Sequence, residues 1–276
     1  MKRVILTILV ALAIIGAQAQ TEKKYMLKQL TNGTMVKTPL ENVKRLSFVD
    51  QKTFTVNGVE FRMIKVVGGT YVMGKNLETG YGEDPHNVTL SDYYIGETEV
   101  TQELWQAVMG SNPSEHKGTK LPVEKVSWED CQAFVTKLMS LTGRTFRLPT
   151  EAEWEFAAKG GNLCEGYLYS GSNVVGDVAW CKDNANKQSH EVATKAPNEL
   201  GLYDMSGNLD EWCQDWYASY STEDQTNPTG PTSGKTRVTR GGYFNSSITF
   251  CRTHARFGYN PTYHLNLIGL RLALTP

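Results

Sequence analysis

The sequence predicts an α+β domain built from short strands, a few helices and much irregular chain. Two observations favour this class. Apolar and polar residues alternate between Phe54 and Gly74, as in strands joined by turns, and helical patterns follow only between Thr98 and Gly161. The chain is rich in glycine and shows little helical periodicity beyond Gly161, so we expect loops and short strands there.

The first residues have the pattern of a signal peptide. Lys2 and Arg3 precede an apolar run, Val4–Ile15, which is too short to span a bilayer comfortably, and Ala17–Ala19 has the A-x-A form of a cleavage site. We therefore expect residues 1–19 to be removed and the mature chain to be exported to the periplasm, the cell surface or the medium. No later segment is apolar enough to predict a membrane span.

Residues 20–50 predict a small β-rich appendage. The pattern indicates one strand, a turn at Asn32-Gly33, a second strand, and a third strand near Leu46–Val49. This stretch is too short to form a domain alone. We expect the main domain to occupy residues 54–276.

The main domain begins with strands. Turn signals at Asn57-Gly58 and Gly68-Gly69 divide the alternating stretch into strands. Asn76–Pro85 is polar and contains glycine, which indicates a loop. Val88–Ile95 predicts a further strand.

Three helices follow. In Thr98–Met109, Thr101 suits the N-cap position. Ser127–Leu141 gives the clearest helical pattern, with Ser127 as its N-cap. A third, short helix starts after Thr150.

The ends and faces of the later helices are also predicted. The second helix stops at Gly143 and buries a stripe of Phe134, Leu138 and Leu141. In the third helix Thr150 and Glu153 form a capping box, and a Gly-Gly pair ends the helix.

The cysteines do not form a familiar metal or redox motif. Export permits disulfides, but an odd number leaves at least one thiol unpaired. No C-x-x-C is present, and no two histidines lie three or four residues apart, so a zinc ribbon and a helical His–His metal site are excluded. The five cysteines are Cys131, Cys164, Cys181, Cys213 and Cys251.

An oxygen-rich turn lies at the centre of the stretch Asn198–Tyr217. Asn208, Asp210 and Glu211 place three side-chain oxygen donors within four residues, and Ca²⁺ takes oxygen ligands of this kind. The same residues also suit a plain tight turn capped by Asn208, with both carboxylates in solvent. Residue chemistry alone favours the plain turn.

Four motifs resemble the formylglycine-generating enzyme family, also called the sulfatase-modifying-factor family. They are RLPTEAEWEFAAKGG, GLYDMSGNLDEWCQDWY, RGGYF and IGLRLAL, and the resemblance runs from Phe54 to Leu274. It implies an α+β fold, the formylglycine-generating-enzyme variant of the C-type-lectin-like fold, which is loop-rich with short sheets.

The resemblance also implies a structural calcium ion in the oxygen-rich turn. Carried over to this sequence, its ligands are the side chains of Asn208 and Glu211 and the carbonyl of Leu209, with the carbonyl of Cys213 as a further candidate. A second calcium site of the family does not carry over, because Ala179–Val192 differs in length and ligands.

The catalytic chemistry of the family does not carry over cleanly. Family enzymes oxidise a sulfatase cysteine to formylglycine with copper(I) held by two cysteines five residues apart, after a Gly-Gly-Ser sequence. Here Tyr243 replaces that serine, Ser246 occupies the first cysteine position, and the arginines that follow place Cys251 beyond the second. Copper(I) prefers two thiolates, so a copper site is not expected. A structural role for Cys251, such as a disulfide with Cys213, is favoured.

Two functions of different classes remain. The first is a binding or structural module that recognises a protein or a glycan without turnover. Tyrosine and asparagine make good contact surfaces, although the same residues also occur in ordinary loops. The candidate contact residues are Tyr243, Phe244, His254, Phe257, Tyr259, Tyr263 and His264.

The alternative is a formylglycine-generating oxidase with an altered thiol site. Cys251 would supply the thiol, and His254, three residues on, would act as the base. In a strand those two side chains would point to opposite faces, so binding is favoured over catalysis.

Two arginines predict buried ion pairs. Arg240 and Arg271 lie among apolar residues, where a guanidinium pairs with a carboxylate or with carbonyls. The expected partners are Glu99, Glu153 or Glu155.

The charge balance argues against a nucleic-acid-binding protein. The 29 acidic and 28 basic residues nearly balance, whereas nucleic-acid-binding proteins normally carry a basic excess on one face.

Overall fold

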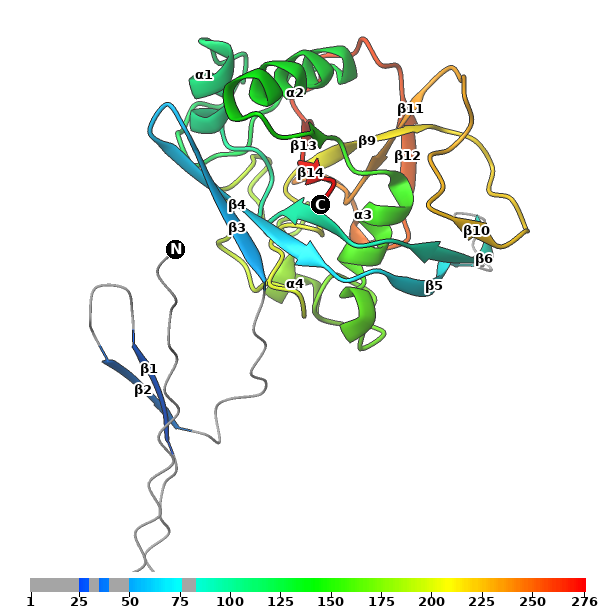
Figure 1. The fold of residues 1–276 in the computed structure, drawn as a ribbon, viewed down its shortest axis with the longest axis horizontal. Coiled ribbons are helices and arrows are strands. Elements are labelled where there is room, and N and C mark those ends of the chain that lie inside the picture. Colours follow the sequence, from blue (N-terminus) through cyan, green and yellow to red (C-terminus); the bar gives the residue numbers. More distant parts are fainter. Residues whose placement is uncertain (1–24, 30–34, 40–49, 76–82) are drawn as a thin grey trace, which may run out of the picture. The chain divides into compact units, whose positions relative to one another are not determined.

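The computed structural model describes residues 25–29, 35–39, 50–75 and 83–276 (Figure 1). The chain divides into two compact units, Met1–Phe48 and Val49–Pro276. In the first unit β1 (Tyr25–Gln29) pairs antiparallel with β2 (Met35–Pro39), as the sequence predicts. The signal peptide, the turn at Asn32-Gly33 and the strand near Leu46–Val49 lie outside the described residues.

Three sheets form the framework of the second unit. The five-stranded sheet has the order β3-β4-β7-β14-β8, the four-stranded sheet β12-β11-β9-β13 and the three-stranded sheet β10-β6-β5. Both larger sheets are completed by strands from the last residues of the chain. The strands are β3 (Gln51–Val56), β4 (Val59–Val66), β5 (Gly69–Lys75), β6 (Glu83–Leu90), β7 (Tyr93–Gly96), β8 (Phe146–Arg147), β9 (Asp210–Trp216), β10 (Gln225–Thr226), β11 (Arg237–Arg240), β12 (Arg256–Tyr259), β13 (Ile268–Leu270) and β14 (Ala273–Leu274).

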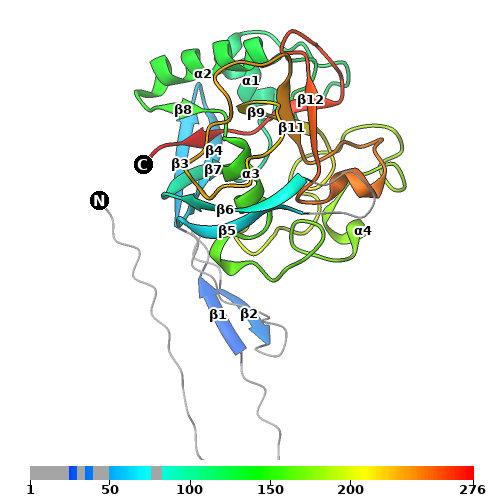
Figure 2. The ribbon, with the colours of Figure 1, turned by 90° about the vertical axis from the view of Figure 1, so that its right-hand side faces the viewer.

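The helices pack on these sheets (Figures 1 and 2). α1 and α2 lie against one another and against the five-stranded sheet, whereas α3 contacts both the three-stranded and the four-stranded sheet. No helix among the described residues is long and apolar enough to cross a membrane. The helices are α1 (Gln102–Met109), α2 (Trp128–Thr142), α3 (Glu151–Ala158) and α4 (Val175–Val178), with 3₁₀ helices η2 (Gly161–Leu163) and η3 (Ile248–Cys251).

The predicted helix starts are confirmed. The Thr101 hydroxyl accepts a hydrogen bond from the backbone of α1, and Ser127 and Thr150 each form a capping box. Gly143 ends α2 in the left-handed conformation. The predicted stripe of α2 is wrong at its last position: Leu141 is 49% exposed, whereas Phe134 and Leu138 are fully buried.

The prediction of a single strand over Val88–Ile95 is also wrong. The segment forms parts of two strands, β6 and β7, which pair with β5 and β4. Side chains stabilise the break between them: the Ser91 amide donates to Asn227, and Asp92 accepts from the Gly68 amide. β6 begins at Glu83, so the last residues of the predicted loop belong to a strand.

Buried ion pairs connect α3 to the four-stranded sheet. Arg240 contacts Glu155 at 2.6 Å and Glu151 at 2.9 Å, which confirms one of the predicted partners. Arg271 instead pairs with Glu211 at 2.7 Å, because β13 and the chain that follows it run beside β9. The prediction of Glu99 or Glu153 as a partner for these arginines is wrong; Glu153 pairs with Arg147.

Candidate functional site

The candidate site is built from the segment between β11 and β13, which is irregular apart from η3 and β12. Gly241 and Gly242 start it with positive φ values of 103° and 74°, which suit glycine. A Cβ atom on Gly242 would stand 2.8 Å from the Phe250 carbonyl oxygen. The Gly-Gly pair therefore lets η3 pack closely on the start of the loop.

The far part of this segment presents side chains to solvent. Tyr263 is 50% exposed, and the exposed His264 lies 2.8 Å from the Asp130 carboxylate. The backbone beneath them is fixed: the Lys125 amide donates to the Leu265 carbonyl, and Leu265 packs on the main core cluster. Rigid, exposed aromatic side chains of this kind suit contact with a partner.

Two predicted contact residues are buried and do not belong to the surface. Phe244 is 6% exposed and packs with Ala185 and Leu209. His254 is 7% exposed, and burial lowers its pKa to about 4. Both are therefore removed from the predicted face.

The remaining three candidates are half-buried. Phe257 packs edge-on against Phe250, with ring centroids 5.0 Å apart. Burial raises the pKa of Tyr259 to about 12, and the pKa of Tyr243 is also raised, chiefly by burial; nearby Asp210 adds to both shifts. The charge of the buried Asp210 carboxyl group therefore acts on both tyrosines.

Sequence reasoning missed Trp180 at this surface. Trp180 and Tyr243 are both partly buried over the cluster that contains Phe244. The Trp180 ring stacks on His190 at 3.8 Å, and the Lys195 ammonium lies 4.0 Å from its centre. The sequence signal for Trp180 is a tryptophan in a polar loop, which favours a contact surface.

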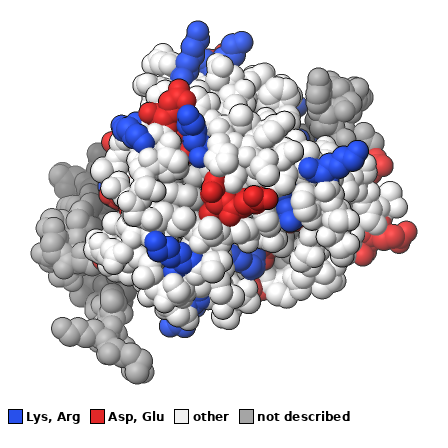
Figure 3. All heavy atoms as spheres, turned by 90° about the horizontal axis from the view of Figure 1, so that it is seen from above, with Lys and Arg blue, Asp and Glu red and all other residues white. Residues whose placement is uncertain are grey.

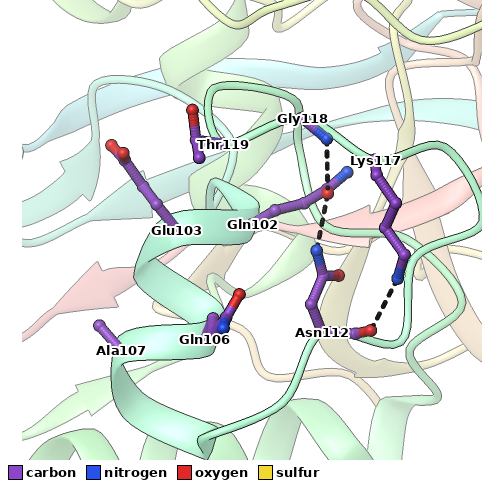
Figure 4. A pocket seen from close by; sticks show the side chains of 8 residues that line it. All are labelled: Gln102, Glu103, Gln106, Ala107, Asn112, Lys117, Gly118 and Thr119. Atoms are coloured by element: carbon purple, nitrogen blue, oxygen red, sulfur yellow. Dashed lines mark hydrogen bonds between the residues drawn. The ribbon is translucent and has the colours of Figure 1, made fainter.

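A hollow of about 620 Å³ lies beside α1 (Figure 4). Its polar side chains largely satisfy one another: the Gln102 side-chain oxygen accepts from Asn112 and from the Gly118 amide, and the Lys117 ammonium donates to the Asn112 carbonyl. His116, next in the chain to the lining, makes an edge-on ring contact with Phe244. His116 therefore connects the loop that borders the hollow to the cluster that contains Phe244. Its lining residues are Gln102, Glu103, Gln106, Ala107, Asn112, Lys117, Gly118 and Thr119.

Cys251 is buried and contacts two side chains. The Ser246 hydroxyl lies 3.7 Å from the Cys251 sulfur, and the Cys181 thiol forms a hydrogen bond with it. Cys213, its expected disulfide partner, lies in β9 within a different core cluster, so the structure does not bring Cys213 to Cys251. Among the described residues, no hydrogen bond joins His254 to Cys251.

Ser246, which the resemblance places at the first copper-ligand position, contacts Cys251 in the structure. The two residues are five apart in the chain, as the two copper ligands of the family are. A serine and a cysteine do not fit copper(I), and the neighbouring Cys181 and Cys251 are only 1% and 0% exposed, which leaves no open position for a substrate thiol.

The oxygen-rich turn has its side chains engaged elsewhere. The Asn208 amide donates to Glu99 and its oxygen accepts from the His190 backbone. Glu211 accepts from Arg271 and from the Trp154 indole. These contacts do not fit a calcium ion, because both oxygen donors are occupied and a guanidinium lies against the carboxylate.

The backbone groups of this turn give no further support for calcium. The Cys213 carbonyl accepts from the Trp128 indole at 2.9 Å, and the Leu209 amide donates to Glu99. Within the described ranges, no three His, Cys, Asp or Glu side chains are grouped to hold a metal ion. Calcium at Asn208 and Glu211 therefore rests on the resemblance alone, and the contacts of these two side chains argue against it.

Charge is dispersed on the face that α1 and α2 occupy at the top of Figure 1. Figure 3 shows basic and acidic side chains interspersed there among uncharged residues. Such a surface does not offer the continuous basic patch that nucleic acid requires.

The short mixed sheets, few helices and long irregular segments define an α+β fold of the formylglycine-generating-enzyme type. The chain belongs to the sulfatase-modifying-factor family: residues 49–276 match the "Sulfatase-modifying factor enzyme 1-like domain". It is 34% identical over 236 residues to the chaperone protein LppX of Paenibacillus barcinonensis, a match covering 67% of this chain and 79% of that protein.

Two further proteins of known name are similar to this chain. The chain is 33% identical over 197 residues to the formylglycine-generating enzyme of Thermomonospora curvata, a match covering 62% of this chain and 61% of that enzyme. Among solved structures, Treponema denticola variable protein 1 has a TM-score of 0.77 at 38% identity, covering 82% of this chain and 99% of that chain.

Proposed function

We propose that the chain is an exported binding module that recognises a protein or a glycan and carries out no turnover. The observation that carries the proposal is the set of exposed or half-buried side chains on the segment between β11 and β13, which we call the tyrosine face and which comprises Tyr243, Phe257, Tyr259, Tyr263 and His264. Its side chains are exposed or half-buried, and the backbone that carries them packs on the core. Little conformational entropy is then lost on binding.

The thiol chemistry supports recognition rather than oxidation. Ser246 takes the place of one copper ligand, and the Cys251 thiol beside it is buried. A cysteine peptide would have to displace core side chains to reach that sulfur. A relative that is named a chaperone protein favours a protein over a glycan as the ligand.

Export follows from the predicted signal peptide and remains part of the proposal. Mass spectrometry of secreted and periplasmic fractions from producing cells tests it. We expect a mature chain beginning at Gln20; an intact Met1 in the cytoplasmic fraction alone would contradict export.

Binding is tested with the purified full chain. Proteins on the surface of producing cells are cross-linked to it and identified, each candidate is purified and titrated directly, and a glycan array provides the second arm. Tyr263→Ala and Tyr259→Ala should each weaken binding about tenfold or more, as expected for aromatic residues at the centre of an interface.

A matched control distinguishes the loss of a contact in the tyrosine face from a general effect of removing a tyrosine. Tyr167 is also partly exposed but lies outside the tyrosine face, so Tyr167→Ala should bind as the unmodified chain does. Equal affinity of Tyr263→Ala, Tyr259→Ala and Tyr167→Ala for every identified ligand would refute the proposed face.

A further inference from the structure

Two buried thiols from distant parts of the chain meet beneath the candidate site. Cys181, which follows α4, and Cys251, the last residue of η3, share a small apolar cluster with Tyr169 and Val178. Their thiols are hydrogen-bonded to one another. The backbones are also joined, because the Lys182 amide donates to the Ser246 carbonyl at 3.1 Å.

We propose that Cys181 and Cys251 form a disulfide bond when the chain folds under oxidising conditions. The described structure brings no other two cysteines into contact. Cys131 and Cys213 lie in separate core clusters, and Cys164 is exposed. A covalent link here would join the loop after α4 to the segment that carries Tyr243.

The reaction balances with a small-molecule disulfide such as glutathione disulfide as the oxidant. The Cys181 thiolate attacks one sulfur of the oxidant, the S–S bond of the oxidant breaks, and one glutathione thiolate leaves. Cys251 then loses its proton and attacks the Cys181 sulfur, which releases the second glutathione. Two electrons pass from the cysteines to the oxidant, and both thiol protons end on the two glutathione molecules.

The pKa values of the two thiols indicate which cysteine attacks first. The hydrogen bond from Cys251 lowers the pKa of Cys181 to about 6, whereas the same contact raises the pKa of Cys251. In a folding intermediate in which the two thiols have met but the oxidant still has access to them, Cys181 is therefore the thiolate and the attacking group. Both sulfurs are buried in the folded chain, so the bond forms as the chain folds.

The test refolds the full chain from urea in a glutathione redox buffer. Free thiols are then alkylated under denaturing conditions, and the digested chain is analysed by mass spectrometry. We expect the Cys181 peptide linked to the Cys251 peptide, with Cys131, Cys164 and Cys213 alkylated. Alkylation of all five cysteines, or a link from Cys251 to any other cysteine, would overturn the proposal.

Thermal unfolding gives the second readout. The oxidised chain should melt about 10 °C above the reduced chain, because the bond closes a long loop in the unfolded state. Cys181→Ser and Cys251→Ser should abolish this difference, whereas the control Cys213→Ser should keep it. If the serine variants do not fold, the mass-spectrometric search for linked Cys181 and Cys251 peptides in the unmodified chain still tests whether the disulfide forms.

Discussion

Asp210 makes the stability of this domain dependent on pH in a predictable direction. Its carboxyl group is buried at the start of β9, where burial and, to a lesser degree, the charge of Glu211 raise the pKa to about 8, although the Gly242 amide donates to it at 3.0 Å. In the unfolded chain the same carboxyl group has a pKa near 3.9. Between this value and about pH 8 the native state holds a proton that the unfolded state has lost, so the free energy of unfolding decreases as pH rises through that range. Between pH 6 and pH 9 this group alone should lower the free energy of unfolding by about 3 kcal/mol.

The assay is urea unfolding of the wild-type chain and of Asp210→Asn at pH 6, 7, 8 and 9. The amide keeps the shape and the acceptor for Gly242 but does not ionise, so the variant should lack this part of the decrease. Asp50→Asn, at an exposed aspartate beside β3, serves as the control and should follow the wild type. Parallel curves for wild type and Asp210→Asn would refute the reasoning.

Three further predictions concern stability. Arg271→Met should lower the free energy of unfolding by about 3–5 kcal/mol, because it leaves the Glu211 carboxylate buried and unpaired; a small loss in urea unfolding would contradict this role. Leu138→Ala should lower the free energy of unfolding by about 2–5 kcal/mol, whereas Leu141→Ala should change it by less than about 0.5 kcal/mol, because only Leu138 is buried. Equal losses of stability in the two variants would contradict this difference in burial. Chelation of calcium should leave the melting temperature unchanged, because Asn208 and Glu211 are engaged with other partners; a fall of several degrees would show that they bind the ion instead.

Local sequence signals predicted the helices well because their causes are local. The caps at Thr101, Ser127 and Thr150 depend on residues no more than three positions away. The β-turns around Asn57-Gly58 follow from the same kind of short-range chemistry. The strand break before β7 was missed because it depends on Asn227, which is distant in sequence.

The candidate site could be predicted only in part. The segment that carries Tyr243 and Tyr263 was identified from composition, but an irregular loop has no period that separates buried from exposed side chains. Phe244 is therefore buried while Tyr263 is exposed, and no sequence pattern distinguishes them. Tertiary packing alone brings Cys181 into contact with Cys251 and pairs Arg271 with Glu211.

Recognition without turnover is tested most directly by an oxidase assay. The reduced full chain is supplied with copper(I), oxygen and a sulfatase-derived cysteine peptide, and the peptide is analysed for the aldehyde by mass spectrometry. We predict no aldehyde, because Ser246 replaces one copper ligand and Cys251 is buried. Aldehyde formation by the unmodified chain that disappears in Cys251→Ser would contradict the account.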